Sequence, residues 1–280
     1  DPREGTAAIS QKSRWQSEFQ KRLDWWSLRP VALVEPPEVP GNWPNNAVDQ
    51  FVLEKLRQNQ LQPSPDADAL VLLRRLTFIL TGLPPGPNQV IAFPIHYSQN
   101  PQLALSSLVD ELLRSPHFGE RFARQWMDVV RYTDTYGYEW DNPAKGSWEY
   151  RDYLIRAFNK DIGFDQLIRE QVAGDLLPEP RIDSASGVNE SLVGPMFYHM
   201  GEHRHGDNEI INGVREEMID NKIDAFSKAF LAMTMACARC HDHKLDAISQ
   251  NDYYAMAGLF MTPRWTSRPI DAPARNEAAI

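Results

Sequence analysis

Apolar residues recur at helical spacing along most of the chain. Ile219, Ile223 and Phe226, for example, are four and three residues apart, so they would lie on one face of an amphipathic helix. Stripes of this kind predict helices over residues 48–56, 70–80, 103–113, 118–132, 148–158, 164–172, 214–236 and 252–260. No segment of useful length alternates between apolar and polar residues, and no internal repeat is evident. The sequence therefore predicts a mainly α fold, an irregular helical domain with long loops.

Proline, glycine and polar residues separate these helices. Residues 24–45 are rich in tryptophan and proline, which excludes a regular helix and favours an extended strap whose tryptophans pack against the body of the protein. Residues 1–20 fit either a short helix or a loose arm, whereas residues 133–146 and 178–212 have the composition of loops. The predicted organisation is an N-terminal arm over residues 1–24, a single helical domain over 25–265 and a C-terminal tail over 266–280.

The composition narrows the range of partners. A net charge of −9 lacks the basic footprint of nucleic-acid binding and disfavours docking to an anionic membrane surface. No apolar stretch reaches the roughly 18 residues of a membrane span. The opening residues also lack the apolar core of a signal peptide, as expected either of a mature N-terminus or of an excerpt from a longer chain. The composition fits a soluble protein that could meet a basic partner.

Both cysteines of the chain lie in one motif. Residues 237–241 read Cys-Ala-Arg-Cys-His and match C-x-x-C-H, the attachment pattern of haem c. Two thiols at this spacing can reach the two vinyl groups of a porphyrin, and the imidazole that follows can bind the iron. For this composition, the expected number of chance matches is roughly 0.0004. The motif predicts one covalent haem c, with Cys237 and Cys240 as thioether residues and His241 as the proximal iron ligand.

Two other chemistries fit the same residues. A C-x-x-C pair can be a redox dithiol or a disulfide, although no βαβ pattern surrounds this one. It can also form half of a zinc site, for which His243 would be a third ligand. These readings remain alternatives to haem.

No motif specifies the sixth ligand of the iron. Three histidines in the 178–212 section and four methionines near the cysteines are candidates: His199, His203, His205, Met233, Met235, Met256 and Met261. We select His203 as the candidate distal ligand, because a histidine-rich loop can fold over a haem, with an open or water-filled position as an equal alternative. Arg239, inside the motif, is a candidate contact for a haem propionate.

Two polar segments could assist the cofactor or bind a second ion. Residues 242–246 could hydrogen-bond the proximal imidazole or the propionates, although a capped turn is the simpler interpretation. The loop with Asp134, Glu139, Asp141 and Asn142 could hold Ca²⁺, although a solvated loop is the simpler interpretation here too.

Several motifs resemble, in order, those of the planctomycete-type cytochrome c domain, a family long classed as one of unknown function. They occupy residues 25–31, 73–76, 81–85, 115–121, 126–128, 173–178 and 237–244, so the resemblance covers about residues 25–262. It implies a haem-bearing, exported module of a kind that often occurs in longer proteins beside a second cytochrome-like domain. Ala247 and Ser249 depart from the family pattern, in which prolines are expected, and this puts the local turn in doubt.

The functional prediction is a c-type cytochrome domain with one haem for electron transfer. Its partner would be a redox protein or a multi-subunit complex, of which the chain could be a peripheral subunit. Because thioether attachment takes place outside the cytoplasm, we expect a periplasmic or cell-surface location. Two alternatives stay open: a peroxidase-like or oxidative haem enzyme with an open sixth position, and a structural or binding module whose motif holds zinc.

Overall fold

The structure, a computed structural model, describes residues 6–137, 141–201, 213–261 and 267–272. These residues are mainly helical, as the sequence predicted. The α-helices are α1 (Thr6–Leu23), α2 (Ala47–Gln58), α3 (Ala69–Thr81), α4 (Pro87–Gln99), α5 (Pro101–Leu113), α6 (Pro116–Val130), α7 (Ser147–Asn159), α8 (Phe164–Ala173), α9 (Glu190–Val193), α10 (Val214–Phe226) and α11 (Gln250–Phe260). Within the described part, extended pairing is limited to three isolated β-bridges. None of the described helices combines the length and hydropathy that a membrane crossing requires.

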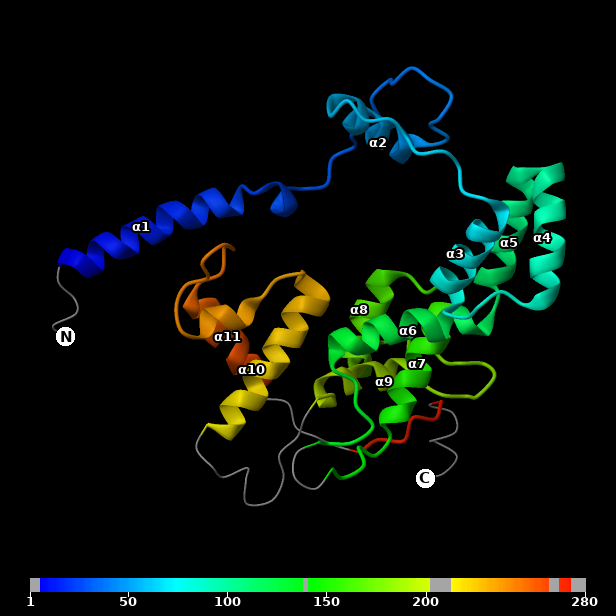
Figure 1. Ribbon diagram of the computed structural model, residues 1–280. Coiled ribbons are helices and arrows are strands. Elements are labelled where there is room, and N and C mark those ends of the chain that lie inside the picture. The colour runs from blue at the N-terminus through cyan, green and yellow to red at the C-terminus, as the bar shows by residue number, and fades with distance from the viewer. Residues whose placement is uncertain (1–5, 138–140, 202–212, 262–266, 273–280) are drawn as a thin grey trace.

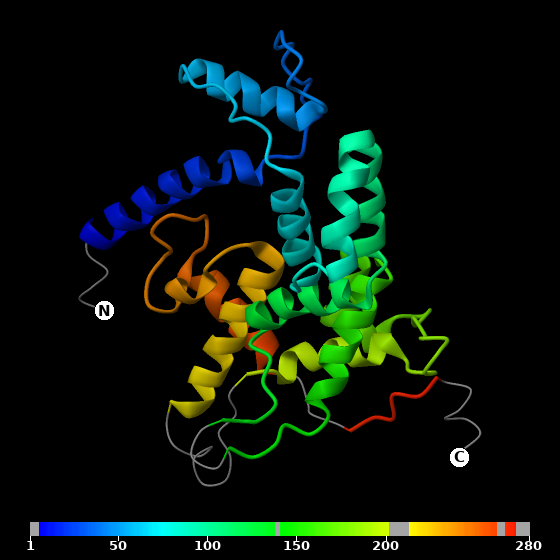
Figure 2. The ribbon, with the colours of Figure 1, turned by 45° about the vertical axis from the view of Figure 1, so that its right-hand side comes forward.

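Three hydrophobic clusters divide the helices between them (Figures 1 and 2). The first joins α3, α4 and α5 around Leu73. The second, here called the central cluster, joins α6, α7 and α8 with the 3₁₀ helix η3 (Gly194–His199) around Phe197. The third joins α10, the 3₁₀ helix η6 (Met235–Arg239) and α11 around Ile223, and we call it the α10–α11 cluster. The C-x-x-C-H motif lies in this last unit.

Phe226 ties the α10–α11 cluster to the central cluster. Its ring centroid lies 6.2 Å from that of Phe197 and 4.9 Å from that of Phe230, both of which pack in the central cluster. On the other side it lies 5.6 Å from Phe260 of α11. Each aromatic pair of this kind adds about 0.5–1.5 kcal/mol beyond simple burial. Aromatic packing therefore fixes the motif-bearing unit to the rest of the body.

The N-terminal part of the chain, with α1, the strap and α2, lies at the periphery of this body (Figure 1). Residues 6–23 are helical, which decides between the two structures that the sequence allowed for this arm. Apart from a 3₁₀ turn at Trp26–Leu28, the strap has no regular helix and is largely extended, as predicted. The expectation that its tryptophans pack against the body is wrong, since Trp25 is 62% and Trp26 73% exposed.

The helix predicted over residues 214–236 is shorter than the apolar stripe suggested. A π-helical turn follows α10 directly, and the chain then reverses at Ala232, whose φ is 52°. Ser227 is buried there, and its hydroxyl donates to the carbonyl of Asp224 at 3.1 Å and accepts the N–H of Met235 at 3.2 Å. A side chain that bonds the backbone in this way competes with the helical pattern. The cysteines therefore lie on a separate turn.

Helix α4 was not predicted from the sequence. Its proline content reads as a helix breaker, but Pro87 stands in the first turn, where no N–H is needed. Pro94 lies inside the helix, and Phe93 beside it is buried against the neighbouring helices of the first cluster. Tertiary packing thus outweighs the local preference.

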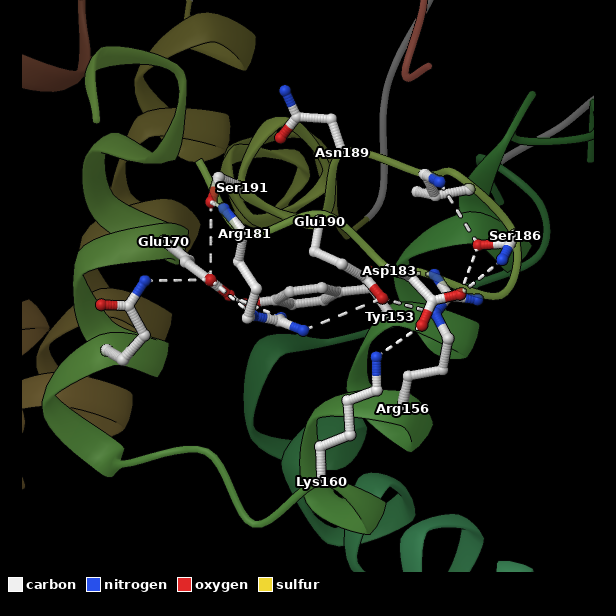
Figure 3. A network of polar contacts seen from close by, with 12 residues as sticks. Tyr153, Arg156, Lys160, Glu170, Arg181, Asp183, Ser186, Asn189, Glu190 and Ser191 are labelled. Carbon is white, nitrogen blue, oxygen red and sulfur yellow. Dashed lines mark hydrogen bonds and ion pairs between the residues drawn. The ribbon is translucent and has the colours of Figure 1, made fainter. Parts of the chain in front are cut away.

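Two buried carboxylates organise the central cluster (Figure 3). Glu170 accepts two hydrogen bonds from the guanidinium of Arg181, both at 2.8 Å, and a third from the Tyr153 hydroxyl at 2.9 Å. Glu190 accepts from Arg156 at 2.6 and 3.0 Å. A buried carboxylate is tolerated only when it is paired and hydrogen-bonded in this way. The network fixes α7, α8 and α9 relative to one another.

Replacing Glu170 with alanine should lower the free energy of unfolding by about 3 kcal/mol, because the Arg181 guanidinium would lose its closest counter-charge in a buried site. Urea unfolding followed by circular dichroism measures this change. The control is Asp165→Ala in the same helix, whose carboxylate pairs with Arg169 at the surface and should contribute less than about 1 kcal/mol. Equal losses in the two variants would contradict the assigned role of Glu170.

Candidate functional site

The C-x-x-C-H motif lies at the surface of the α10–α11 cluster. Cys237 belongs to η6, and Cys240 follows that 3₁₀ helix directly. Both thiols are free and both residues are exposed, as is His241. Ala238 between them is fully buried and anchors the turn in the cluster. The reactive groups therefore point away from a well-packed base.

The imidazole of His241 is held in a defined tautomer. Its Nδ1 lies 2.8 Å from the main-chain carbonyl oxygen of Asp242. A carbonyl oxygen only accepts hydrogen bonds, so Nδ1 carries the proton and donates. In the neutral ring, Nε2 then keeps its lone pair and is the nitrogen available to a metal.

The turn that carries His241 is fastened to the start of α11. The Gln250 main-chain N–H donates to the Asp242 carboxylate at 2.9 Å, and the Gln250 side-chain amide donates to the carbonyl of Arg239 at 3.0 Å. Tyr254, one turn further along α11, donates its hydroxyl to the same carbonyl at 3.2 Å. These contacts, together with the Nδ1 bond, orient the imidazole. No pattern within the motif itself identifies Gln250 or Tyr254.

His243 has a structural role instead of a metal-binding one. Its side chain is buried, and its Nδ1 accepts the main-chain N–H groups of Leu245 at 3.2 Å and Asp246 at 2.7 Å. Its Nε2 therefore carries the proton and contacts Thr234 Oγ1 at 3.2 Å. With both nitrogens engaged, His243 does not supply the third zinc ligand that the sequence allowed.

The donor groups of the motif do not converge on one point. Among the described residues, no group of three or more His, Cys, Asp or Glu side chains is placed to hold a metal ion. A tetrahedral zinc site requires four donors at about 2.0–2.3 Å from the ion. Covalent haem requires no such convergence, because the thiols bind vinyl carbons at the porphyrin edge while the imidazole binds the central iron. The motif supplies the two thiols and the imidazole that a covalent haem would use.

Arg239, the candidate propionate contact, lies beside the motif in an ion pair. Its guanidinium is 3.3 Å from the Asp220 carboxylate, to which the Tyr253 hydroxyl also donates at 2.7 Å. Burial and the hydrogen bond to Asp220 raise the pKa of Tyr253. The Arg239 side chain remains 37% exposed, so it keeps access to an anionic group at the surface.

The candidate distal ligands that the structure describes differ in their surroundings. His203 and His205 lie outside the described residues. His199 contacts the Tyr136 hydroxyl through Nε2 at 3.1 Å, and burial and the nearby Lys222 lower its pKa. Among the methionines, Met235 is buried, Met233 and Met256 pack against the α10–α11 cluster, and Met261 is exposed.

The carboxylate-rich loop is engaged in local hydrogen bonds. Asp134 accepts from the Tyr132 hydroxyl at 2.6 Å, and Asp141 accepts from the Thr135 hydroxyl. Glu139, which the sequence grouped with them, lies outside the described residues. The described carboxylates thus stabilise the loop itself.

One family of known proteins matches the chain. The family model described as PSCyt2, a protein of unknown function (DUF1549), matches residues 47–264. No match was found among curated proteins, and none among solved structures. The matched span covers most of the chain and includes the C-x-x-C-H motif, whereas α1 and the strap precede it.

Replacing His243 with alanine in protein made without haem should lower the free energy of unfolding by about 2–4 kcal/mol, because a buried imidazole is lost and two partly buried N–H groups lose their acceptor. Chemical denaturation measures the change. His241→Ala is the matched control, since its exposed ring makes one local hydrogen bond and should contribute less than about 0.5 kcal/mol. A larger loss in the control would reverse the assigned roles of the two histidines.

Proposed function

We propose that this chain, which belongs to the PSCyt2 family that its motifs resemble, carries one covalent haem c and transfers electrons through it. The observation that carries the proposal is the fixed tautomer of the exposed His241 imidazole. Its Nδ1–H is tied to the Asp242 carbonyl, so an exposed imidazole presents its Nε2 lone pair beside two free thiols. That combination matches the residues a C-x-x-C-H haem needs.

The two thiols supply the attachment. Cys237 and Cys240 would hold the group through thioether bonds: each S–H would add across one vinyl C=C bond, with the sulfur on one carbon and the hydrogen on the other, so no external oxidant would be needed. Cys237 and Cys240 are exposed and unpaired by a disulfide, as this addition requires. Their rigid base, with Ala238 buried between them, holds both at the same surface.

His241 would hold the iron from one side through Nε2. The Asp242 carbonyl keeps the proton on Nδ1 and fixes the orientation of the ring, and Gln250 holds Asp242 in place. When bound, haem supplies one-electron chemistry between Fe(II) and Fe(III). We expect a redox protein partner outside the cytoplasm, in the periplasm or at the cell surface, because thioether attachment takes place there.

The decisive experiment is expression in a host that attaches haem c, followed by absorption spectra of the oxidised and reduced protein and a haem stain on a denaturing gel. We expect a Soret band, a sharp α band on reduction, and a stain that survives denaturation. The variant Cys237→Ala/Cys240→Ala should lose the stain completely, because both thioether bonds are gone. His241→Ala should keep the stain but lose the sharp α band, because the proximal ligand is gone.

A wild-type protein without colour, made beside a haem-loaded reference cytochrome in the same host, would contradict the proposal. Stoichiometric zinc in that colourless protein would favour the structural module instead. A haem that stains but binds cyanide rapidly would place the protein with haem enzymes, since a six-coordinate electron carrier lacks an open position.

A further inference from the structure

Helix α1 is docked on the loop that follows the haem motif. The Arg22 guanidinium donates to the main-chain carbonyls of His243 at 2.5 Å and Asp246 at 3.3 Å, across more than 220 residues of sequence. Figure 2 shows α1 above the loop that leads into α11. The contact begins two residues after His241. An element from outside the matched family span thus lies next to the motif.

The same face of α1 carries two aromatic rings. The Arg22 guanidinium lies over the Trp15 ring, 5.0 Å from its centroid, and the Phe19 ring is 5.8 Å from that of Trp15. Spacings of four and seven residues put the three side chains on one side of the helix. They are half-buried, whereas Gln16 and Gln20 are exposed. The aromatic side of α1 is therefore the side that faces the loop.

A haem at this motif would need cover from another element. Cys237, Cys240 and His241 are all exposed, so the group would sit outside the α10–α11 cluster. The porphyrin is a large apolar surface, and each Å² removed from water is worth about 25 cal/mol. Through His241, the turn after η6 would contact one face of the group, and the other face would need cover from elsewhere. Aromatic side chains on a docked helix are suited to the remainder.

We propose that α1 is the second wall of the haem site, with Trp15 and Phe19 in contact with the porphyrin and Arg22 fastening the helix to the 243–246 loop. This inference rests on the proposed haem function. It adds that a segment outside the matched family span sets the exposure of the haem, and with it the reduction potential, which depends on solvent access.

Hydrogen–deuterium exchange tests the wall without altering α1. The haem-loaded full chain is compared with the haem-free variant Cys237→Ala/Cys240→Ala. The backbone amides of residues 6–23 should exchange more slowly in the loaded protein, because contact with the porphyrin holds the helix in place. Equal exchange in the two forms would overturn the proposal and leave α1 as a brace of the loop alone.

The second test is the reduction potential of Trp15→Ala/Phe19→Ala with haem attached. Water that reaches the porphyrin stabilises the more highly charged ferric state, so the potential should fall. The haem stain and the haem-to-protein ratio should stay at the wild-type level, because attachment needs only the two thiols. Trp26→Ala is the matched control, since it removes an exposed tryptophan of the strap and should leave the potential unchanged.

An unchanged reduction potential in Trp15→Ala/Phe19→Ala, or an equal fall in Trp26→Ala, would overturn the proposal that α1 forms the second wall of the haem site. Loss of covalent haem from the wild-type protein is a different result, because it removes the proposed function itself. The stain and the potential therefore separate the two failures.

Discussion

The buried pairing of Glu170 with Arg181 is the interaction on which the central cluster depends. A carboxylate without solvent contact is costly unless hydrogen-bond donors engage its oxygens, and here two guanidinium nitrogens and a tyrosine hydroxyl do this. The backbone of the same residue is in close contact with Gly194, where a Cβ would come within 2.3 Å of the Glu170 carbonyl oxygen. Glycine at that position lets η3 pass directly over α8. The ion pair and the missing side chain together place Phe197 in the core.

From Phe197 the packing continues outward to the motif. Its ring contacts Phe226, the last residue of α10, and Phe230, in the π-helical turn that follows. Between these two rings in the sequence, the buried hydroxyl of Ser227 accepts the N–H of Met235 and holds the start of η6. Packed aromatic rings therefore lie beneath the motif. The two thiols and the imidazole lie on a short segment at the surface, which hydrogen bonds to α11 hold in place. The core thus positions the motif, while Cys237, Cys240 and His241 remain exposed at the surface.

The sequence was informative where one local pattern decides the structure. Helical periodicity predicted most of the long helices, whereas the haem-binding role that C-x-x-C-H predicts for Cys237, Cys240 and His241 stays a prediction. It was not informative where distant groups decide. The Ser227 hydroxyl ends a stripe that periodicity would continue, and the packing of Phe93 permits a helix that prolines argue against. The buried ion pairs and the role of His243 join residues whose partners no spacing rule identifies.

For the proposed haem, a sequence motif can reveal where the group would be attached, but it cannot reveal what would set the properties of the iron. Thioether bonds hold the haem whatever its affinity for the fold, so five consecutive residues are enough to specify attachment, and a motif can reveal it. The properties of the iron would depend instead on the carbonyl that holds the imidazole proton, on the amide of Gln250 and on helix α1, which Arg22 fastens to the 243–246 loop. These contacts need a folded body of this size to bring them together. A minimal haem-carrying turn would bind the same group. Nothing in such a turn would fix the orientation of the imidazole or limit the solvent exposure of the haem.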